Sequence, residues 1–166
     1  MPEDATAFVK IQEESYARAG PGIRTSYPRS QAMDAPRLAA FLSSKRYAVC
    51  ATSRPDGRPQ ASPVAFIIWN GAFWLASVRG ARLRNLQARP YASVVIMEGE
   101  GLAHRAVMAE GPVVLHEVRS TDLVSGEFRQ RWMDRHGSAP TWAAALIEIR
   151  PARLFSYDAT STAPQP

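Results

Sequence analysis

The chain has 166 residues, of which 46% are hydrophobic and 21% charged, as in an ordinary globular protein with one buried core. It has no apolar run of about 18 residues and no secretory signal pattern at its start, so we expect no membrane span and a cytoplasmic location. The single cysteine, Cys50, excludes an internal disulfide, while a net charge of +5 is compatible with an anionic partner.

The first predicted elements are two helices separated by an irregular arm. Residues 5–19 are expected to be helical, and the Gly-Pro-Gly sequence at 20–22 ends that segment. Residues 21–33 are polar and are expected to be irregular. Asp34 is a predicted N-cap for a second helix that ends near Lys45. The apolar face of this helix consists of Leu38, Phe41 and Leu42.

The rest of the chain is predicted to consist mainly of strands. They are expected over residues 47–53, 58–69, 72–77, 91–97, 102–116, 146–149 and 153–157. Asn70-Gly71 is typical of a type I′ hairpin turn. Pro63 cannot donate to a ladder and therefore marks an edge, a bulge or an open position. Gly111-Pro112 is expected to bend the long strand.

Two helices interrupt these strands. One is expected over residues 81–89, and the other runs from a cap at Ser120 or Thr121 to His136. Mostly antiparallel strands with few helices predict a mainly β, barrel-like sheet. Its apolar strands also indicate that a partner chain completes the burial.

A basic segment opens the helix predicted at 81–89. Hydroxyl, guanidinium and amide donors gather near its N-terminus, which itself attracts anions. The donors are Ser77, Arg79, Arg82, Arg84 and Asn85. A solvated helix face is the simpler alternative. Eighteen of the twenty basic residues are Arg, which fits either a GC-rich genome or selection for bidentate anion binding, but only the second explains this cluster.

Five short segments carry a resemblance through their order and spacing. They are Ala48-Val-Cys-Ala-Thr52, Asp56-Gly-Arg-Pro-Gln60, Ser62-Pro-Val64, Arg82-Leu-Arg-Asn-Leu86 and Ala106-Val-Met-Ala-Glu-Gly111. Over residues 35–157 the chain resembles the pyridoxamine 5′-phosphate oxidase-like family of flavin-binding split β-barrels. It looks most like the small members that bind FMN or the 8-hydroxy-5-deazaflavin coenzyme (factor 420).

The resemblance implies an antiparallel split β-barrel over residues 34–157. It leaves an N-terminal helix and irregular arm at 1–33 and a tail expected to be disordered at 158–166. It also implies a homodimer with two cofactor sites at the subunit interface. The cofactor ring would lie against Ser62, Pro63, Val64 and Ala65. The phosphate would meet Ser77, Arg82, Arg84 and Asn85, with Arg79 nearby. Arg82 stands where many relatives have Lys, and the two cations differ in geometry.

Such a cofactor would explain why no catalytic triad, metal-binding set or P-loop is recognisable. A flavin or deazaflavin carries the hydride itself, and the protein orients it and excludes water. We therefore expect an oxidoreductase that acts on a small organic substrate, with backbone N–H groups near Val64 bonded to the ring. His104 is a candidate proton donor, although an exposed strand end is the alternative.

Other residues and other functions have simpler interpretations. We expect Cys50 to be a buried core residue rather than a nucleophile, and His116 and His136 to lie on the surface. Tryptophans 69, 74, 132 and 142 are expected to pack in a core or interface. A non-catalytic cofactor carrier or a haem-binding protein of the same fold remains an alternative. Nucleic-acid binding is disfavoured, because the strands lack a row of aromatic residues between basic ones.

Overall fold

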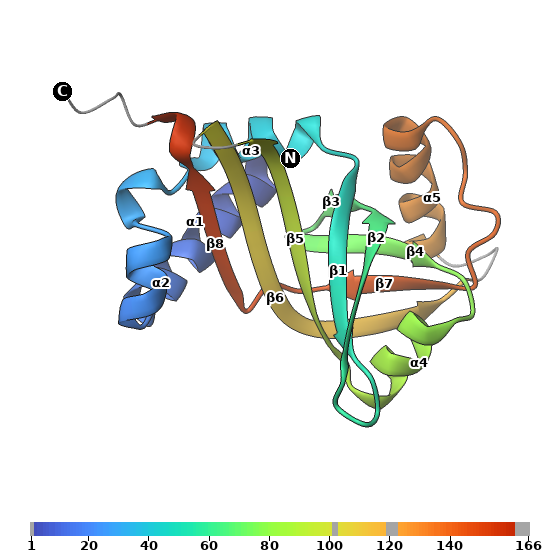
Figure 1. Ribbon diagram of the computed structural model, residues 1–166. Helices are drawn as coiled ribbons and strands as arrows, with labels where there is room; N and C mark the ends of the chain where they lie inside the picture. Colours follow the sequence, from blue (N-terminus) through green and yellow to red (C-terminus); the bar gives the residue numbers. More distant parts are fainter. Residues whose placement is uncertain (1, 101–102, 119–122, 162–166) are drawn as a thin grey trace.

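The computed structural model describes residues 2–100, 103–118 and 123–161 (Figure 1). Its helical elements are α1 (Pro2–Ala17), α2 (Pro21–Ser26), the 3₁₀ turn η1 (Arg29–Gln31), α3 (Ala35–Ser44), α4 (Ala81–Ala88), α5 (Leu123–His136) and the 3₁₀ turn η2 (Ala159–Ser161). Its strands are β1 (Tyr47–Ser53), β2 (Pro59–Ala65), β3 (Ile67–Trp69), β4 (Ala72–Ser77), β5 (Tyr91–Glu100), β6 (Ala103–Glu117), β7 (Ala145–Ile149) and β8 (Arg153–Asp158). Within the described ranges, no helix has the length and apolarity needed to cross a membrane.

All described strand pairs are antiparallel, which confirms the predicted fold class. The strands follow the order β2-β1-β5-β6-β7-β4-β3, and β8 pairs with β6 outside this path. In the described structure β2 and β3, at the two ends of the path, do not pair, so the barrel-like sheet is not closed. The predicted split barrel therefore matches the observed architecture.

Strand β6 passes from one half of the sheet to the other. Its residues 105–110 pair with β8, and its residues 113–117 pair with β7. The change of partner falls at Gly111, where a Cβ atom would lie 1.9 Å from the carbonyl oxygen of Arg150. Only glycine permits this close approach, and the bend expected at Gly111-Pro112 is confirmed.

The strand predicted at 58–69 is in fact two strands, so that prediction was wrong. β2 pairs with β1, whereas β3 pairs with β4. Between them, the Phe66 side chain is fully buried in the core, and the chain changes from one half of the sheet to the other at this residue. The turn after β3 is as predicted, because Asn70 and Gly71 have φ angles of 55° and 71°.

The main core fills the space between the sheet halves and is closed by α1 and α3. Asp34 caps α3 as predicted, since its carboxylate accepts a hydrogen bond from the backbone N–H of Arg37. The three apolar residues predicted for this helix are buried. Cys50 also belongs to this core, and burial raises the pKa of its thiol to about 11.

A second, smaller core lies between α5 and the outer face of β3, β4 and β7. Trp74, Phe128 and Trp132 are each at most 4% exposed there. Trp69 packs beside them, with its ring centroid 4.9 Å from that of Trp74. The packing predicted for the tryptophans is therefore confirmed, except that Trp142 is 53% exposed.

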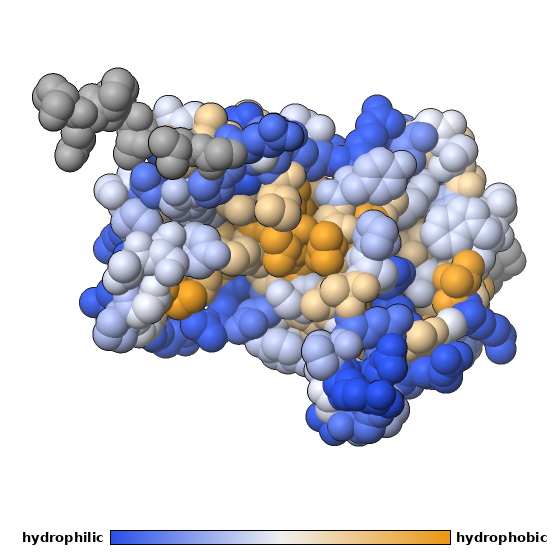
Figure 2. All heavy atoms as spheres, viewed as in Figure 1, coloured by the Kyte–Doolittle hydropathy of each residue, from blue (hydrophilic) through white to orange (hydrophobic). Residues whose placement is uncertain are grey.

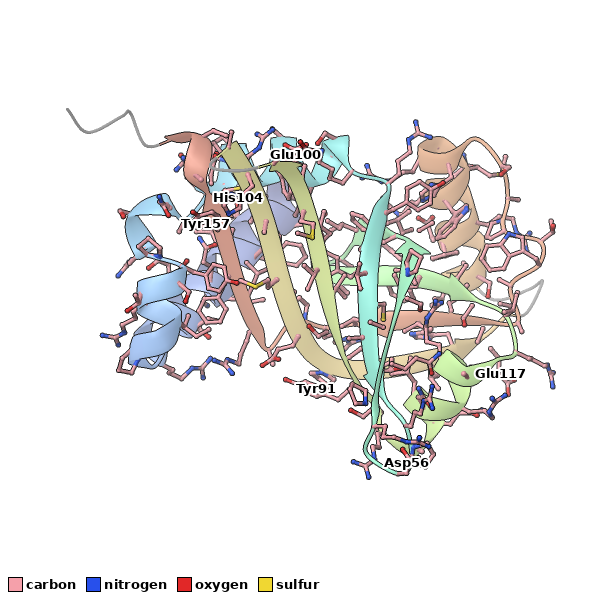
Figure 3. The ribbon with its side chains drawn as sticks, in the orientation of Figure 1. Asp56, Tyr91, Glu100, His104, Glu117 and Tyr157 are labelled. Carbon is pink, nitrogen blue, oxygen red and sulfur yellow. The ribbon has the colours of Figure 1, made fainter. Side chains whose placement is uncertain are left out.

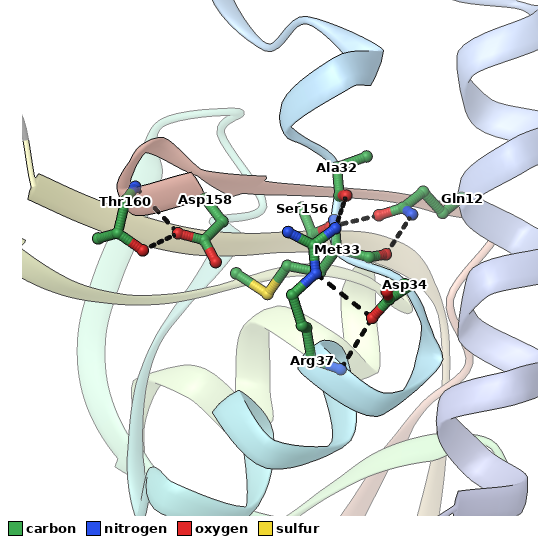
Figure 4. A network of polar contacts seen from close by, with 8 residues as sticks. All are labelled: Gln12, Ala32, Met33, Asp34, Arg37, Ser156, Asp158 and Thr160. Atoms are coloured by element: carbon green, nitrogen blue, oxygen red, sulfur yellow. Dashed lines mark hydrogen bonds and ion pairs between the residues drawn. The ribbon is translucent and has the colours of Figure 1, made fainter. Parts of the chain in front are cut away.

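The N-terminal residues pack on the sheet. Phe8 of α1 stacks on Phe73 of β4, with ring centroids 5.1 Å apart. A buried polar network then joins α1 to β8 (Figure 4). In it, Gln12 donates to the carbonyl of Met33, and the Ser156 hydroxyl accepts from the Met33 N–H and donates to Gln12. These bonds fix α1 and the chain before α3 to the barrel.

The outcome differs for three sequence-based predictions, which concern residues 21–33, the start of α5 and the C-terminal tail. Residues 21–33 were expected to be irregular, but they form α2 and η1, so this prediction was partly wrong. The cap expected at Ser120 or Thr121 lies outside the described residues. In the predicted tail, Asp158 ends β8 and Ala159–Ser161 form η2, while residues 162–166 lie outside the described ranges.

Candidate functional site

The predicted ring site lies on β2, an edge strand that pairs only with β1 in the described structure. Hydrogen bonds from Phe66 N–H to the Arg46 carbonyl and from Arg54 N–H to the Arg58 carbonyl bracket this ladder. Antiparallel ladders alternate between bonded and non-bonded pairs. Backbone groups of residues 60, 62 and 64 therefore face β1, and those of residues 61, 63 and 65 face the open edge.

This alternation explains the proline and changes the candidate donors. Pro63 occupies a position whose backbone faces the open edge, so its missing N–H costs no ladder bond. Of the three positions predicted for Pro63, an edge, a bulge or an open position, the structure shows the edge. The N–H of Val64 faces β1 rather than a ligand, while Ala61 and Ala65 present N–H groups at the open edge.

Arg82 reaches from α4 to the inner side of β2. Its Nη2 donates to the Ser62 hydroxyl at 2.8 Å, which joins two residues of the predicted site. The guanidinium lowers the pKa of the Cys50 thiol, although burial has the larger and opposite effect. The Nε atom of Arg82 is buried and has no hydrogen-bond partner among the described residues. Leaving a buried donor unpaired costs about 1–3 kcal/mol, so this group is suited to an anionic ligand.

Asn85 and Ser77 use their predicted donors within the protein. The Asn85 side chain is buried, and its Nδ2 donates to Thr52 Oγ1 and Gln60 Oε1, both at 3.0 Å. The Ser77 hydroxyl is buried and donates to the carbonyl of Val78 at 3.1 Å. Asn85 therefore holds the β1–β2 hairpin against α4 and positions Arg82 beside it.

Arg79 and Arg84 lie on the other side of α4. Residues two apart on a helix are separated by about 200° of rotation, so Arg82 and Arg84 point in opposite directions. Arg79 and Arg84 line a cavity of about 590 Å³ between α4 and the end of β6. The predicted basic cluster is therefore divided, with one arginine at β2 and two near β6.

His104 lies at the start of β6, at the opposite end of that strand from α4 (Figure 3). Its ring centroid is 4.9 Å from that of Tyr157 on β8. The neighbouring Arg105 forms an ion pair with Glu98 and covers the Phe41 ring. Within one protomer, His104 is therefore not brought together with the residues around Arg82.

An apolar surface covers the outer face of β1, β5 and β6 (Figure 2). It ends before β8, whose Phe155 is 7% exposed and packs with Tyr16 and Ala19. The register places Val49, Val95 and Met108 side by side in one row, and Pro63 of β2 continues that row. In the next row, Met97 is 69% exposed. We call this surface, from Pro63 across to Met108, the open face; it adjoins the free edge of β2.

Two histidines predicted to lie on the surface are instead half-buried and held by specific contacts. His116 Nε2 lies 2.8 Å from a carboxylate oxygen of Glu148, and His136 Nε2 lies 3.2 Å from the carbonyl oxygen of Phe66. The surface prediction was wrong because both partners are distant in sequence. Glu148, which the sequence did not single out, is 5% exposed and also accepts from Arg150. Among the described residues, no cluster of three or more His, Cys, Asp or Glu side chains could hold a metal ion.

Solved structures share this fold at low sequence identity. HutZ, the heme storage protein from Vibrio cholerae, matches with a TM-score of 0.64 and 19% identity over 74% of this chain and 93% of that chain. A FAD-binding protein from Mesorhizobium loti matches with a TM-score of 0.60 and 18% identity over 76% of this chain and 93% of that chain. An F420 reductase matches with a TM-score of 0.55 and 22% identity over 69% of this chain and 93% of that chain. These likenesses establish the fold alone.

Sequence comparison gives the family. No curated protein matches this chain in sequence. The sequence pattern of the family described as pyridoxamine 5′-phosphate oxidase, however, matches residues 35–158, which include the whole sheet and the Arg82–Ser62 pair. This range agrees with the resemblance drawn from the short segments. The chain therefore belongs to the pyridoxamine 5′-phosphate oxidase-like family.

Proposed function

We propose that this protein is a flavin-dependent oxidoreductase that binds FMN and transfers a hydride to or from a small organic substrate. The observation that carries the proposal is the Arg82 guanidinium, which contacts Ser62 beside the open edge of β2 and keeps a buried Nε without a partner. Family membership and the flavin-type names of similar structures support the same assignment.

The residues present fit such a cofactor at two points. The open edge of β2 offers backbone N–H groups at Ala61 and Ala65, which suit the polar edge of a planar ring. The outer side chains of Pro63 and Ala65 are small and apolar and would contact the ring itself. Arg82 and Ser62 would hold the phosphate by charged hydrogen bonds. When bound, the flavin would supply the hydride chemistry, and the protein would orient it and exclude water.

A homodimer is part of this proposal. The open face is uncovered in a single protomer, and large exposed apolar patches mark interaction sites. Its continuation into Pro63 would place a second copy of the chain directly beside the ring site. In that arrangement His104 of one protomer would come near the site of the other and serve as a proton donor, which the distance within one protomer prevents.

The deazaflavin coenzyme is the alternative cofactor. An F420 reductase shares the fold, and this coenzyme has a longer and more anionic tail than FMN. Arg58, on the turn beside β2, forms an ion pair with Asp56 and is exposed, so it would have to change partner to meet such a tail. FMN requires only the Arg82–Ser62 pair, and we therefore place it first.

Haem binding without catalysis is the second candidate function. HutZ shares the fold, and His104 stands next to Tyr157 at the margin of the open face, where an apolar macrocycle could find an axial ligand. The open face lacks the basic residues that nucleic acid would need between its apolar ones.

An absorption spectrum of the purified protein, followed by titration with FMN, the deazaflavin coenzyme and haem, tests the proposal. Tryptophan fluorescence reports binding, and saturation by FMN at micromolar concentration or below is the expected result. Tight binding of haem with a Soret band, and none of FMN, would replace the flavin assignment by the haem one. If FMN binds, turnover with a reductant and an acceptor separates an enzyme from a cofactor carrier.

A further inference from the structure

The cavity between α4 and the end of β6 does not belong to the cofactor site proposed above. Its volume of about 590 Å³ is within the range of small-molecule sites. Gly80, Leu83 and Gln87 line it from the α4 side together with Arg79 and Arg84, and residues 115–117 line it from β6. Arg82, by contrast, points to β2 on the opposite side of the helix.

Two guanidinium groups in this lining have no charged partner in the part of the chain that the structure describes. Arg79 and Arg84 are exposed, and neither forms an ion pair with any described residue. Other arginines nearby in the sequence are engaged, such as Arg58 with Asp56 and Arg89 with the carbonyl of Pro55. Two guanidinium groups without an ion-pair partner among the described residues, on one cavity wall, match the geometry of a carboxylate or phosphate.

The edge of β6 adds a backbone donor. Arg150 N–H bonds to the Pro112 carbonyl on the β7 side, and Val113 N–H bonds to the Pro90 carbonyl on the opposite side. In an antiparallel pair, the backbone groups of successive residues face alternate sides of the strand. Because Pro112 bonds to β7, the N–H and C=O of Leu115, three residues later, face away from β7 and toward α4. Leu115 therefore presents an unpaired strand edge to the cavity that Arg79 and Arg84 line.

The remaining walls are apolar or electrically compensated. Leu83, Leu115 and Ala144 supply apolar surface. His116 is fixed by Glu148, whose buried carboxylate is also paired with Arg150. Among the described lining residues, Glu117 is the one acidic side chain, and it lies beside α4 at the exposed rim (Figure 3). Two arginines therefore face one carboxylate, and the cavity has a net attraction for anions.

We propose that this cavity binds a small molecule that combines an oxyanion with an apolar body. The oxyanion, a carboxylate or a phosphate, would bind Arg79 and Arg84, and the apolar body would pack on Leu83 and Leu115. This α4–β6 site is independent of the cofactor site, because it shares no residue with the Arg82–Ser62 pair.

Titration of the ¹⁵N-labelled protein with benzoate and with phenylphosphate, at constant ionic strength, tests the site. Saturable shifts are expected for the backbone N–H signals of Gly80 and Leu115. The double change Arg79→Ala with Arg84→Ala should weaken binding by at least about tenfold, as loss of charged hydrogen bonds predicts. Glu117→Gln should strengthen it. Tighter binding of phenylphosphate would identify a phosphate ligand, and tighter binding of benzoate a carboxylate ligand.

Matched variants make the test decisive. Arg18→Ala removes the same charge from an exposed site at the end of α1 and should leave the affinity unchanged. Gln87→Glu places a carboxylate in the lining at an exposed helix position and should weaken binding even if the double variant folds poorly. The proposal is overturned if neither probe saturates, if Arg18→Ala matches the double variant, or if Arg82→Ala abolishes these shifts.

Discussion

The two outer faces of the split sheet differ in how they are covered. The face of β3, β4 and β7 is covered by α5, and Trp132 on that helix is 4% exposed. The open face of β1, β5 and β6 is also apolar, but Tyr47 and Met97 on it are 68% and 69% exposed. An apolar face that the chain leaves uncovered is typical of an interaction site, in line with the homodimer proposed above.

The contrast between the covered face and the open face also indicates where the candidate site lies. The covered face is separated from solvent by aromatic packing, and His136 at its margin bonds to the Phe66 carbonyl. The neighbouring Arg135 donates through its Nη atoms to the carbonyls of Leu42 and Ser43, although its buried Nε has no hydrogen-bond partner among the described residues. The open face ends at β2, where the N–H groups of Ala61 and Ala65 face the open edge of the strand. The buried Nε of Arg82 has no hydrogen-bond partner among the described residues. Unsatisfied polar groups and uncovered apolar surface therefore occur next to each other, which is the arrangement expected where a cofactor and a second protomer bind.

The largest effect should come from the covered face. Trp132→Ala removes a ring that packs on Phe128 at 5.2 Å and on His136 at 4.3 Å. Loss of a buried aromatic side chain is expected to lower the free energy of unfolding by about 3–5 kcal/mol. Urea unfolding followed by circular dichroism measures this loss, which should not depend on protein concentration. A loss below about 1 kcal/mol would show that α5 does not stabilise the sheet.

A charge on the open face should act differently. Val95→Asp places a carboxylate in the centre of the row formed with Val49 and Met108. If two copies bury this face, an unpaired charge there should weaken association by roughly 3 kcal/mol or more, about a hundredfold. Analytical ultracentrifugation measures the change.

The control for Val95→Asp is Leu123→Asp. Leu123 is 86% exposed at the start of α5, away from the open face. Leu123→Asp should leave association unchanged. A wild-type protein that stays monomeric at high concentration would contradict the homodimer and leave the open face without its proposed partner.

The next effect tests the division of the arginines around α4. Arg82→Ala should weaken FMN binding by roughly 1.5–3 kcal/mol, because it would remove the charged hydrogen bond that we propose to the phosphate. Arg84→Ala removes the same charge from the opposite side of the helix and should leave FMN affinity nearly unchanged. Isothermal titration calorimetry compares the two. Equal losses would mean that long-range charge, rather than contact with Arg82, governs binding.

Much of this architecture could be predicted from the sequence because the signals were local. Asn70-Gly71 specified its turn through two positive φ angles, and Asp34 specified a helix start. Pro63 limited its position to an edge, a bulge or an open point of the strand, and the structure shows the edge. Each of these depends on residues close in the chain. The family resemblance was carried by similar short segments and is confirmed over residues 35–158.

The placement of the site residues could not be predicted from the sequence, because it depends on tertiary contacts. The basic residues around 79–85 form a single cluster in the sequence, but helix geometry sends Arg82 to β2 and Arg84 to β6. The donors of Asn85 are taken up by Thr52 and Gln60, which no spacing rule indicates. Similarly, strand alternation turns the N–H of Val64 toward β1 and leaves Ala65 at the open edge. Ligand contacts that were inferred from residue type alone must therefore be revised once it is known which side of a helix or strand each residue occupies.

The smallest predicted effect is a pH dependence that belongs to the covered face. Burial lowers the pKa of His136, while its hydrogen bond to the Phe66 carbonyl acts in the opposite direction. A histidine whose folded pKa is depressed contributes stability that is complete above its unfolded pKa, about 6.5. That contribution is lost as the pH falls through the folded pKa, because protonation then favours the unfolded chain. Since His136 is partly exposed, the loss should stay below about 1 kcal/mol.

Urea unfolding at pH 7.5 and at pH 5 measures this loss, and His136→Gln should reduce it while keeping a donor for the Phe66 carbonyl. Carboxylates such as Asp34, whose pKa is lowered by the Arg37 N–H, lose their contribution only at lower pH and so do not interfere. A protein that becomes more stable between pH 7.5 and pH 5 would contradict the sign. It would mean that the carbonyl bond outweighs burial, and that even the covered face favours a charged group at its margin.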